Sequence, residues 1–306
     1  MNLFSRTVKV VTHDGSFHPD EVFACAALSL WAEKNNKKLK IIRTREKAII
    51  EKADMVVDMG GIFDSNTNRF DHHQKNRAGQ RENQIPYASF GLVWKKYGVE
   101  ICNDPNVAFR IDQALVVPID AKDNGVNFSK NNEASFRDCP ISEAIYNLNF
   151  IWQINKTSPD ELFKKALTIA KDILVGEIAA IKVLANDKKE TLEAIKVQNE
   201  PEILILDKNL EWCEAVAECK NIKFVISPRK EKSEWAIQVG RDNLEDYNSD
   251  RIKFPGNWFG LVGEDLEKVS GIKGALFCAN GGWFAIAKTK EGVLAMANKA
   301  LQIAQN

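Results

Sequence analysis

The sequence has no net charge, no long apolar run and no dense group of cysteines. Lysine plus arginine and aspartate plus glutamate each number 42 among 306 residues, so no overall field draws the molecule to nucleic acid or to an anionic membrane. No stretch approaches the ~20 apolar residues that cross a bilayer, and the amino terminus has no signal pattern. The six cysteines are scattered, which excludes a disulfide scaffold or a zinc ribbon. We expect a soluble cytoplasmic protein with reduced thiols, in which a local patch binds any polyanion.

The first part of the chain alternates between β-branched segments and segments of helical periodicity. Strands are predicted over 7–11, 39–42 and 55–58, helices over 20–31 and 47–53, a short extended segment over 69–71 and further helices over 86–97 and 106–117. Alternation of this kind is typical of a parallel sheet with helices on both faces. The sequence therefore predicts an α/β fold with a doubly wound, mostly parallel N-terminal sheet.

The middle of the chain carries a weaker pattern, which predicts little between residues 136 and 158. Ser158 and Pro159 then open a long helical stretch, as N-cap and first helical residue, that extends to about Val197. After Pro201 the strand and helix rhythm restarts. We expect a metal-binding catalytic domain over 1–150, a helical linker over 151–200 and a smaller α/β substrate-binding domain over 201–306.

All four histidines lie in two short motifs, HDGSFHPDE over 13–21 and RFDHHQ over 69–74, both next to predicted strand ends. Open α/β sheets bind ligands at the carboxyl ends of their strands, and imidazole with carboxylate is a ligand set for Mn, Zn or Fe. Asp58 ends the third strand, and PIDAKDNG adds two more aspartates. The seven candidate donors, enough for two metals, are His13, His18, Asp20, Asp58, His72, Asp120 and Asp123. The opposing interpretation, four ordinary loop histidines, is weakened because all four lie beside aspartates.

The local geometry of the first motif also favours a metal site. Gly15 permits a tight return and Pro19 stands where a helix begins, so His18 and Asp20 can approach one centre from two sides. A carboxylate at a strand tip, such as Asp58, can bridge two ions that lie ~3.5–4 Å apart and clamp a phosphoryl group. The competing interpretation of Asp58 is a turn residue before Gly60 and Gly61. One of Asp120 and Asp123 is expected to be only a turn former beside Asn124 and Gly125.

Together these motifs resemble the DHH phosphoesterase superfamily, which includes RecJ-type exonucleases, oligoribonucleases and manganese pyrophosphatases. One branch of this superfamily is named for the melanocyte proliferating gene, and its members are described as metal-dependent hydrolases and 3′-to-5′ RNA exonucleases. Four sequence segments look like this branch: THDGSFHPDE, VDMGGIFD, RFDHHQ and IDAKDNG. FPGNWFGL and GALFCANGGWF look like that branch's second, DHHA1-like domain, so the resemblance covers most of the chain.

The resemblance implies a role for each motif residue. It implies His13 and His18 on a first metal, Asp20 and His72 on a second, and Asp58 between them. Asp123 completes the second site, with Asp120 as its competitor. His73 contacts the scissile phosphate or acts as general acid, and Asp71 accepts an imidazole N–H rather than binding metal. His18 replaces an Asp of many relatives, which leaves the metal open among Mn²⁺, Mg²⁺, Zn²⁺ and Fe²⁺, with Mn²⁺ preferred.

Substrate contacts are expected in both domains. Lys75, Arg77 and Arg81 follow the DHH motif and could hold phosphates, although a solvated loop explains them equally well. In the second domain the resemblance implies that the Gly281-Gly282 turn presents its backbone to the substrate. The usual following His is absent, because Trp283 stands there. Further candidates are Arg241, Asn257, Trp258 and Trp283, although core packing is the better explanation for the aromatic residues.

Three functions compete at this point. The leading hypothesis is a two-metal phosphodiesterase that acts on the ends of RNA or DNA. The second is a hydrolase of a small phosphate compound such as a dinucleotide or pyrophosphate, which the zero net charge favours. The third is a metal-dependent regulatory protein without turnover, which would not need seven converging donors. The partner is a nucleic acid or nucleotide and not a membrane, and a homodimer is allowed.

Overall fold

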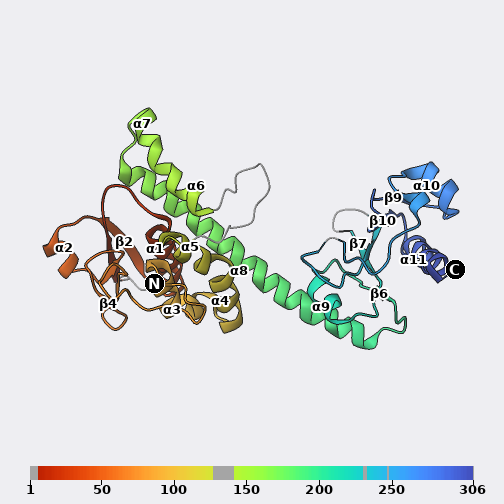
Figure 1. Ribbon diagram of the computed structural model, residues 1–306, viewed down its shortest axis with the longest axis horizontal. Coiled ribbons are helices and arrows are strands. Elements are labelled where there is room, and N and C mark those ends of the chain that lie inside the picture. Colours follow the sequence, from red (N-terminus) through yellow and green to blue (C-terminus); the bar gives the residue numbers. More distant parts are fainter. Residues whose placement is uncertain (1–5, 127–140, 230–232, 247, 306) are drawn as a thin grey trace. The chain divides into compact units, whose positions relative to one another are not determined.

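Figure 1 shows the computed structural model, which describes residues 6–126, 141–229, 233–246 and 248–305. The chain forms two compact units, Met1–Ile181 and Lys182–Asn306, and their boundary falls inside the long helix α8 (Pro159–Val197). The three-part division at residues 150 and 200 stays a prediction. Cys139 lies outside the described residues. No helix that the structure describes is long and apolar enough to cross a membrane.

The first unit contains a five-stranded sheet in the order β2-β1-β3-β5-β4. Its central pairs are parallel, and the short edge strand β4 is antiparallel to β5. The strands are β1 (Thr7–Thr12), β2 (Lys38–Arg43), β3 (Met55–Val57), β4 (Phe63–Asp64) and β5 (Arg69–Phe70). The predicted α/β class with a mostly parallel sheet is confirmed.

Helices cover both faces of this sheet. Successive strand residues point to opposite faces, so neighbouring residues belong to different cores. Val10 faces the large core that α1 and α3 build, whereas Val11 packs near Ile49 and Ile50 around the short α2. The elements are α1 (Pro19–Lys34), α2 (Lys47–Glu51), α3 (Ser89–Cys102), α4 (Pro105–Ile111), the π-helix η1 (Asp112–Val116), α5 (Val117–Asp123), α6 (Ile141–Asn147), the 3₁₀-helix η2 (Leu148–Phe150) and α7 (Ile151–Asn155).

The start of α1 buries two acidic residues. Pro19 is its first residue, as predicted, and His18 is its N-cap. Asp20 and Glu21 lie in the first turn, where the helix dipole favours negative charge. Because α1 is apolar almost all round and packs against the sheet and α3, both carboxylates are fully buried.

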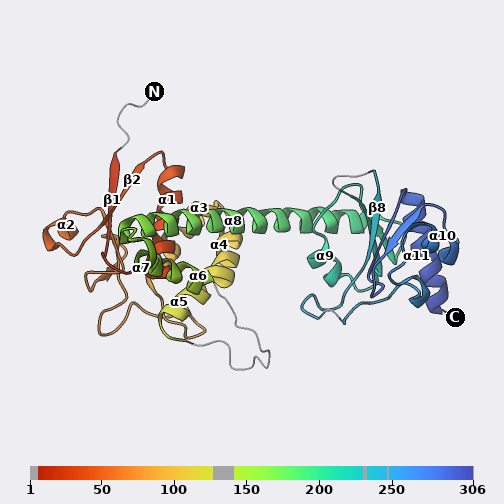
Figure 2. The same cartoon turned by 90° about the horizontal axis from the view of Figure 1, so that it is seen from above.

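The second unit contains a separate five-stranded sheet in the order β6-β7-β8-β10-β9, in which only β6 and β7 are parallel. Helix α11 packs against β7, β8 and β10 (Figure 2), and α9 contributes to a smaller core with Leu204 and Val225. The elements are β6 (Ile203–Ile205), α9 (Cys213–Glu218), β7 (Phe224–Pro228), β8 (Trp235–Val239), the 3₁₀-helix η3 (Gly256–Trp258), α10 (Gly263–Ser270), β9 (Ala275–Cys278), β10 (Phe284–Ala287) and α11 (Lys290–Gln305).

A close contact at Gly91 ties α3 to α5. The N–H of Gly91 donates to Asp120 Oδ1 at 3.0 Å, and Arg81 Nη1 donates to Asp120 Oδ2 at 2.8 Å. A Cβ at Gly91 would lie 1.9 Å from Asp120 Oδ2 and 2.8 Å from Arg81 Nη2. Only glycine allows the carboxylate to approach the helix this closely.

We therefore expect Gly91→Ala to lower the free energy of unfolding by ~1–3 kcal/mol, because the methyl group must displace a buried ion pair. Urea denaturation followed by tryptophan fluorescence measures the change. The matched control is Gly176→Ala in the interior of α8, where a Cβ meets nothing within 4 Å. Loss of a helical glycine should leave stability unchanged or raise it by up to about 1 kcal/mol. Equal effects at the two positions would show that the Gly91 contact is unimportant.

Candidate metal centre

Asp58 directly follows β3, and its two carboxylate oxygens are turned toward two different imidazoles. Oδ2 is 3.4 Å from His13 Nε2, and Oδ1 is 3.2 Å from His72 Nε2. Its φ of 58° lies in the left-handed region, which is uncommon for residues other than glycine and often marks a functional position. Its N–H donates to Phe70 O at 3.0 Å, which fixes this turn against β5. Asp58 is therefore placed between two potential ligand groups.

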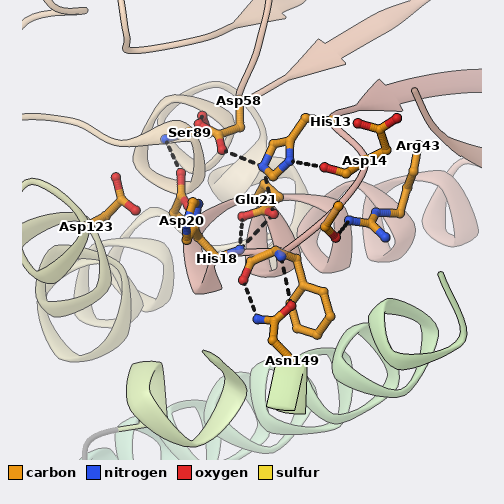
Figure 3. Close-up of polar contacts among 12 residues, drawn as sticks. His13, Asp14, His18, Asp20, Glu21, Arg43, Asp58, Ser89, Asp123 and Asn149 are labelled. Carbon is orange, nitrogen blue, oxygen red and sulfur yellow. Dashed lines mark hydrogen bonds and ion pairs between the residues drawn. The ribbon is translucent and has the colours of Figure 1, made fainter. Parts of the chain in front are cut away.

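The first group contains His13, His18, Glu21 and Asp58, whose ligand atoms lie within 4.8 Å of one another. His13 Nδ1 is 3.0 Å from the carbonyl oxygen of Asp14, so Nδ1 carries a hydrogen, and in the neutral ring Nε2 keeps its lone pair. That lone pair faces Glu21 Oε1 at 3.1 Å as well as Asp58 (Figure 3). Three electron-rich atoms that face one another need a cation, either a proton or a metal ion, between them.

The second group surrounds His72. Its Nε2 is 3.2 Å from Asp123 Oδ2, 3.2 Å from Asp58 Oδ1 and 3.8 Å from Asp20 Oδ2. This buried nitrogen and the buried Asp20 Oδ1 both lack a hydrogen-bond partner among the residues that the structure describes. Buried polar atoms are rarely left without a partner. A divalent cation among Asp20, Asp58, His72 and Asp123 would satisfy both atoms, so the donor set fits a metal.

The pKa values of these groups reflect their burial and their closeness to one another. Burial, then the charges of Asp58 and Asp123, raises the pKa of Asp20 well above its usual range. Burial alone would lower the pKa of His13, but hydrogen bonds to Asp58 and Glu21 raise it to about 10. Despite burial, the imidazoles of His13 and His72 hold the pKa of Asp58 well below its usual range. The centre therefore holds more negative charge than its own groups neutralise.

Hydrogen bonds from Ser89 and His18 orient three of the carboxylates. The N–H of Ser89, at the first turn of α3, donates to Asp20 Oδ2 at 3.2 Å, and its hydroxyl lies 3.0 Å from Asp58 Oδ1. The N–H of His18 donates to both oxygens of Glu21 at 2.8 Å. Sequence reasoning missed Ser89 and Glu21. Glu21 stands three residues after the N-cap His18, the spacing of a capping box, and that signal could have identified it.

His73 and Asp71 form a pair at the edge of the centre. Asp71 is buried, and its Oδ1 is 2.8 Å from His73 Nδ1, while its Oδ2 accepts from the N–H of Gly61 at 2.5 Å. The His73 side chain is 60% exposed, so its other nitrogen can reach solvent. His73 Nδ1 also lies 3.5 Å from Asp58 Oδ1, within range of the second group.

The structure places the two competing aspartates of α5 in different surroundings. Asp120 is fully buried against Arg81 and Gly91, away from the imidazoles, and burial raises its pKa to about 7 although Arg81 opposes the shift. Asp123 lies beside His72. Of the two, only Asp123 belongs to a group of potential ligands in the described part of the chain.

A cavity of about 980 Å³ opens beside the centre. His18, His72, His73 and Asp123 line it from one side, and its rim includes Lys75, Arg77 and Lys122. Lys75 and Arg77 thus lie where the sequence placed them, next to the donors. Arg81 does not, because its side chain is only 7% exposed and pairs with Asp112 and Asp120.

The candidate residues of the second unit include one that needs correction. Trp258 is 1% exposed and stacks on Phe254, so it belongs to the core and cannot present a substrate surface. Asn257 is exposed, and Arg241 Nε donates to Asp250 Oδ1 at 2.9 Å. The carbonyl of Gly282 accepts from the N–H of Phe254, and Gly281 is half-buried. At 42% exposure Trp283 is accessible.

Comparison with known proteins assigns a family. The model MYG1_exonuc, described as an uncharacterised protein family (UPF0160), matches residues 9–301. The chain belongs to the MYG1 family. A MYG1 protein of Caenorhabditis elegans is 30% identical over 98% of this chain and 96% of its own, and one of Chlamydia pneumoniae is 32% identical over 92% of each. A human protein named MYG1 exonuclease is 27% identical over 96% of this chain and 85% of its own. The family predicted from the motifs is confirmed, and the predicted enzyme class agrees with its name.

Among solved structures, RecJ from Thermus thermophilus in complex with Mn²⁺ aligns with 97% of this chain at 12% identity and a TM-score of 0.29. This chain covers 52% of that RecJ chain, about half its length.

Divalent metal should stabilise the first unit, because it neutralises buried carboxylates. At 100 times its dissociation constant, Mn²⁺ should add ~2.7 kcal/mol per site, which corresponds to about 5–10 °C in Tm. Differential scanning fluorimetry after chelation and after re-addition of Mn²⁺ measures the shift. Asp58→Asn should lose most of it. Asp14→Asn, on the loop that carries His13, is the control, because its side chain is 54% exposed and points to Arg45. No shift in the parent protein would contradict a metal centre.

Proposed function

We propose that this protein is a two-metal phosphodiesterase that removes nucleotides from the 3′ ends of RNA or DNA. The observation that carries the proposal is Asp58, whose separate oxygens face His13 and His72. The name of the human relative, MYG1 exonuclease, supports the choice of substrate. The intact set of converging donors argues against a purely regulatory protein.

The donors would form two sites that share Asp58. His13 and His18 would hold one ion, with Glu21 close to both. Asp20, His72 and Asp123 would hold the other. Mixed imidazole and carboxylate ligands would suit Mn²⁺, with Mg²⁺, Zn²⁺ and Fe²⁺ as alternatives. Such ions would activate a water molecule and stabilise the negative charge of the phosphoryl group.

His73 is the proposed general acid. Its Nδ1 donates to Asp71, which fixes the ring and leaves Nε2 to hold the proton that passes to the leaving oxygen. Asp71 is in turn fixed by the N–H groups of Gly61 and His73. Lys75 and Arg77 bind the neighbouring phosphates from the cavity rim. In the second unit, Arg241, Asn257 and the Gly281-Gly282 turn are retained as proposed substrate contacts. The homodimer and the cytoplasmic location also stay predictions.

The second candidate, hydrolysis of a dinucleotide or pyrophosphate, is favoured by the zero net charge, since a nuclease that follows a long strand usually has a basic groove. End-labelled RNA and DNA, a dinucleotide and pyrophosphate, each with Mn²⁺ and with Mg²⁺, separate the two. Stepwise release of mononucleotides from the 3′ end is expected. Release from the 5′ end would overturn the polarity, and hydrolysis of pyrophosphate alone would select the second candidate.

His73→Ala tests the general acid through the leaving group. An alkoxide leaving group needs a proton, so kcat on a dinucleotide should fall ~10²-fold or more. A p-nitrophenolate leaving group needs none, so the loss on bis-p-nitrophenyl phosphate should stay below about 10-fold. Metal analysis of the variant should still find two ions per chain. An equal loss on both substrates would show that His73 holds metal or phosphate instead, and unchanged rates on both would remove it from catalysis.

Asp58→Asn tests the shared ligand by a measurement that is independent of activity. Equilibrium dialysis followed by metal analysis should find two Mn²⁺ per chain in the parent protein and a weakened affinity of ~10-fold or more at both sites in the variant. Asp120→Asn should retain both ions, since Asp120 pairs with Arg81 and not with the imidazoles. Loss of a single ion in Asp58→Asn would contradict a bridging role.

A further inference from the structure

Part of the wall of the cavity beside the metal donors is aromatic. Tyr146 and Phe150, from α6 and η2, line the cavity, and their side chains are 38% and 49% exposed. The two rings meet edge to face with centroids 5.9 Å apart. The Tyr146 ring is also parallel to that of His18, at 6.0 Å between centroids and 5° between planes. Large exposed aromatic rings inside a concave site are available to a ligand.

This wall is fixed to the loop that carries His18. Asn149 Oδ1 accepts from the N–H of Phe17 at 3.0 Å, and Asn149 Nδ2 donates to the carbonyl of Phe17 at 2.8 Å (Figure 3). Nδ2 also donates to the carbonyl of Tyr146 at 2.9 Å. Phe17 and Asn149 are both buried. One side chain therefore sets the distance between the aromatic wall and the first metal group.

Charge divides the cavity into two sides. The cations Lys75, Arg77 and Lys122 lie with the metal donors, whereas Glu143 lies on the element that carries Tyr146. A phosphate is attracted to the first side and repelled from the second. A ligand that fills both sides must carry its negative charge at one end and a flat, uncharged group at the other. A nucleotide has this form, and inorganic pyrophosphate does not.

We propose that Tyr146 and Phe150 bind the base of the nucleotide whose phosphate lies at the metal donors. This inference rests on the proposed function and narrows its substrate class to base-bearing phosphoesters. The alternative, that these rings dock another protein, accounts less well for their place inside a cavity that opens on the donors. The cavity volume of about 980 Å³ is at the upper end of the range for small-ligand sites, so it accommodates a nucleotide.

Measurements of ligand affinity test the proposed base site directly. Isothermal titration calorimetry with the full-length protein and Mn²⁺ compares adenosine monophosphate with ribose 5-phosphate, which differ only by the base. We expect adenosine monophosphate to bind ~5- to 100-fold more tightly, the range for one stacked base. Tyr146→Ala and Phe150→Ala should reduce this ratio toward one, and Tyr146→Phe should keep it. Phe109→Ala is the matched control, because Phe109 is 64% exposed on α4 and does not line the cavity.

Hydrolysis separates this inference from the proposed function. A dinucleotide and its analogue that lacks the terminal base are compared in the same variants, with metal content measured in each. The parent protein could hydrolyse the dinucleotide and its analogue equally and also bind adenosine monophosphate and ribose 5-phosphate equally. The proposed base site would then be wrong, and the proposed phosphodiesterase activity would stand. If nothing is hydrolysed but the binding ratio is large and depends on Tyr146, the base site stands without catalysis. Should Tyr146→Ala lose metal or fold poorly, Phe150→Ala decides, since it keeps the Tyr146 ring that lies parallel to His18. An unchanged ratio in Phe150→Ala would then overturn the proposal.

Discussion

The first unit is organised around the burial of acidic side chains beside two imidazoles. Asp20, Glu21 and Asp58 are almost completely removed from water, and Asp123 is mostly so. An isolated buried carboxylate is costly unless hydrogen bonds or opposite charge compensate it. Ser89 and the N–H of His18 provide part of this compensation, but Asp20 Oδ1 still has no donor in the described part of the chain. The centre therefore lacks positive charge, and divalent cations would supply it in a small volume.

The parallel sheet brings these residues together from distant parts of the chain. β1 and β3 are neighbours, with Val11 opposite Val56, so the residues that follow them emerge at one edge. β5 lies beside β3, with Phe70 opposite Val57, and adds His72 at the same edge. The carboxyl ends of the strands therefore supply ligands without any long loop. Helices α1 and α5 close the ring of donors from the face that α3 covers.

Local signals predicted much of this arrangement. Pro19 and Pro159 begin helices as expected, and Ser158 exchanges hydrogen bonds with Glu161 at the start of α8. The prediction of a single helix over 106–117 was wrong in one respect. A π-helical turn, η1, separates α4 from α5 in this region. A π turn changes which positions share a face, and apolar periodicity does not reveal it. The choice between Asp120 and Asp123 could therefore not be made from spacing.

Other residues could not be placed because their roles depend on tertiary contacts. Trp258 and Tyr146 are both aromatic residues in short helical turns, yet one is buried and the other lines a cavity. Composition and spacing do not distinguish them, since exposure is decided by what packs against each ring. The weak pattern before Ser158 concealed Asn149, whose three hydrogen bonds hold Tyr146 near the centre. Polar residues that satisfy a distant backbone leave no local signature.

The charges at the centre also bear on the order in which metal and substrate bind. When all four are ionised, Asp20, Glu21, Asp58 and Asp123 bring four negative charges, which two divalent ions would neutralise. Without ions, the ionised carboxylates among them would repel a phosphodiester across a low-dielectric space, where charge interactions are strong. With ions bound, the single charge of a phosphodiester would face Lys75, Arg77 and Lys122 with little opposition. Under the proposed function, we therefore expect metal to bind before substrate, and this local positive charge would offset the absence of a net positive charge on the protein.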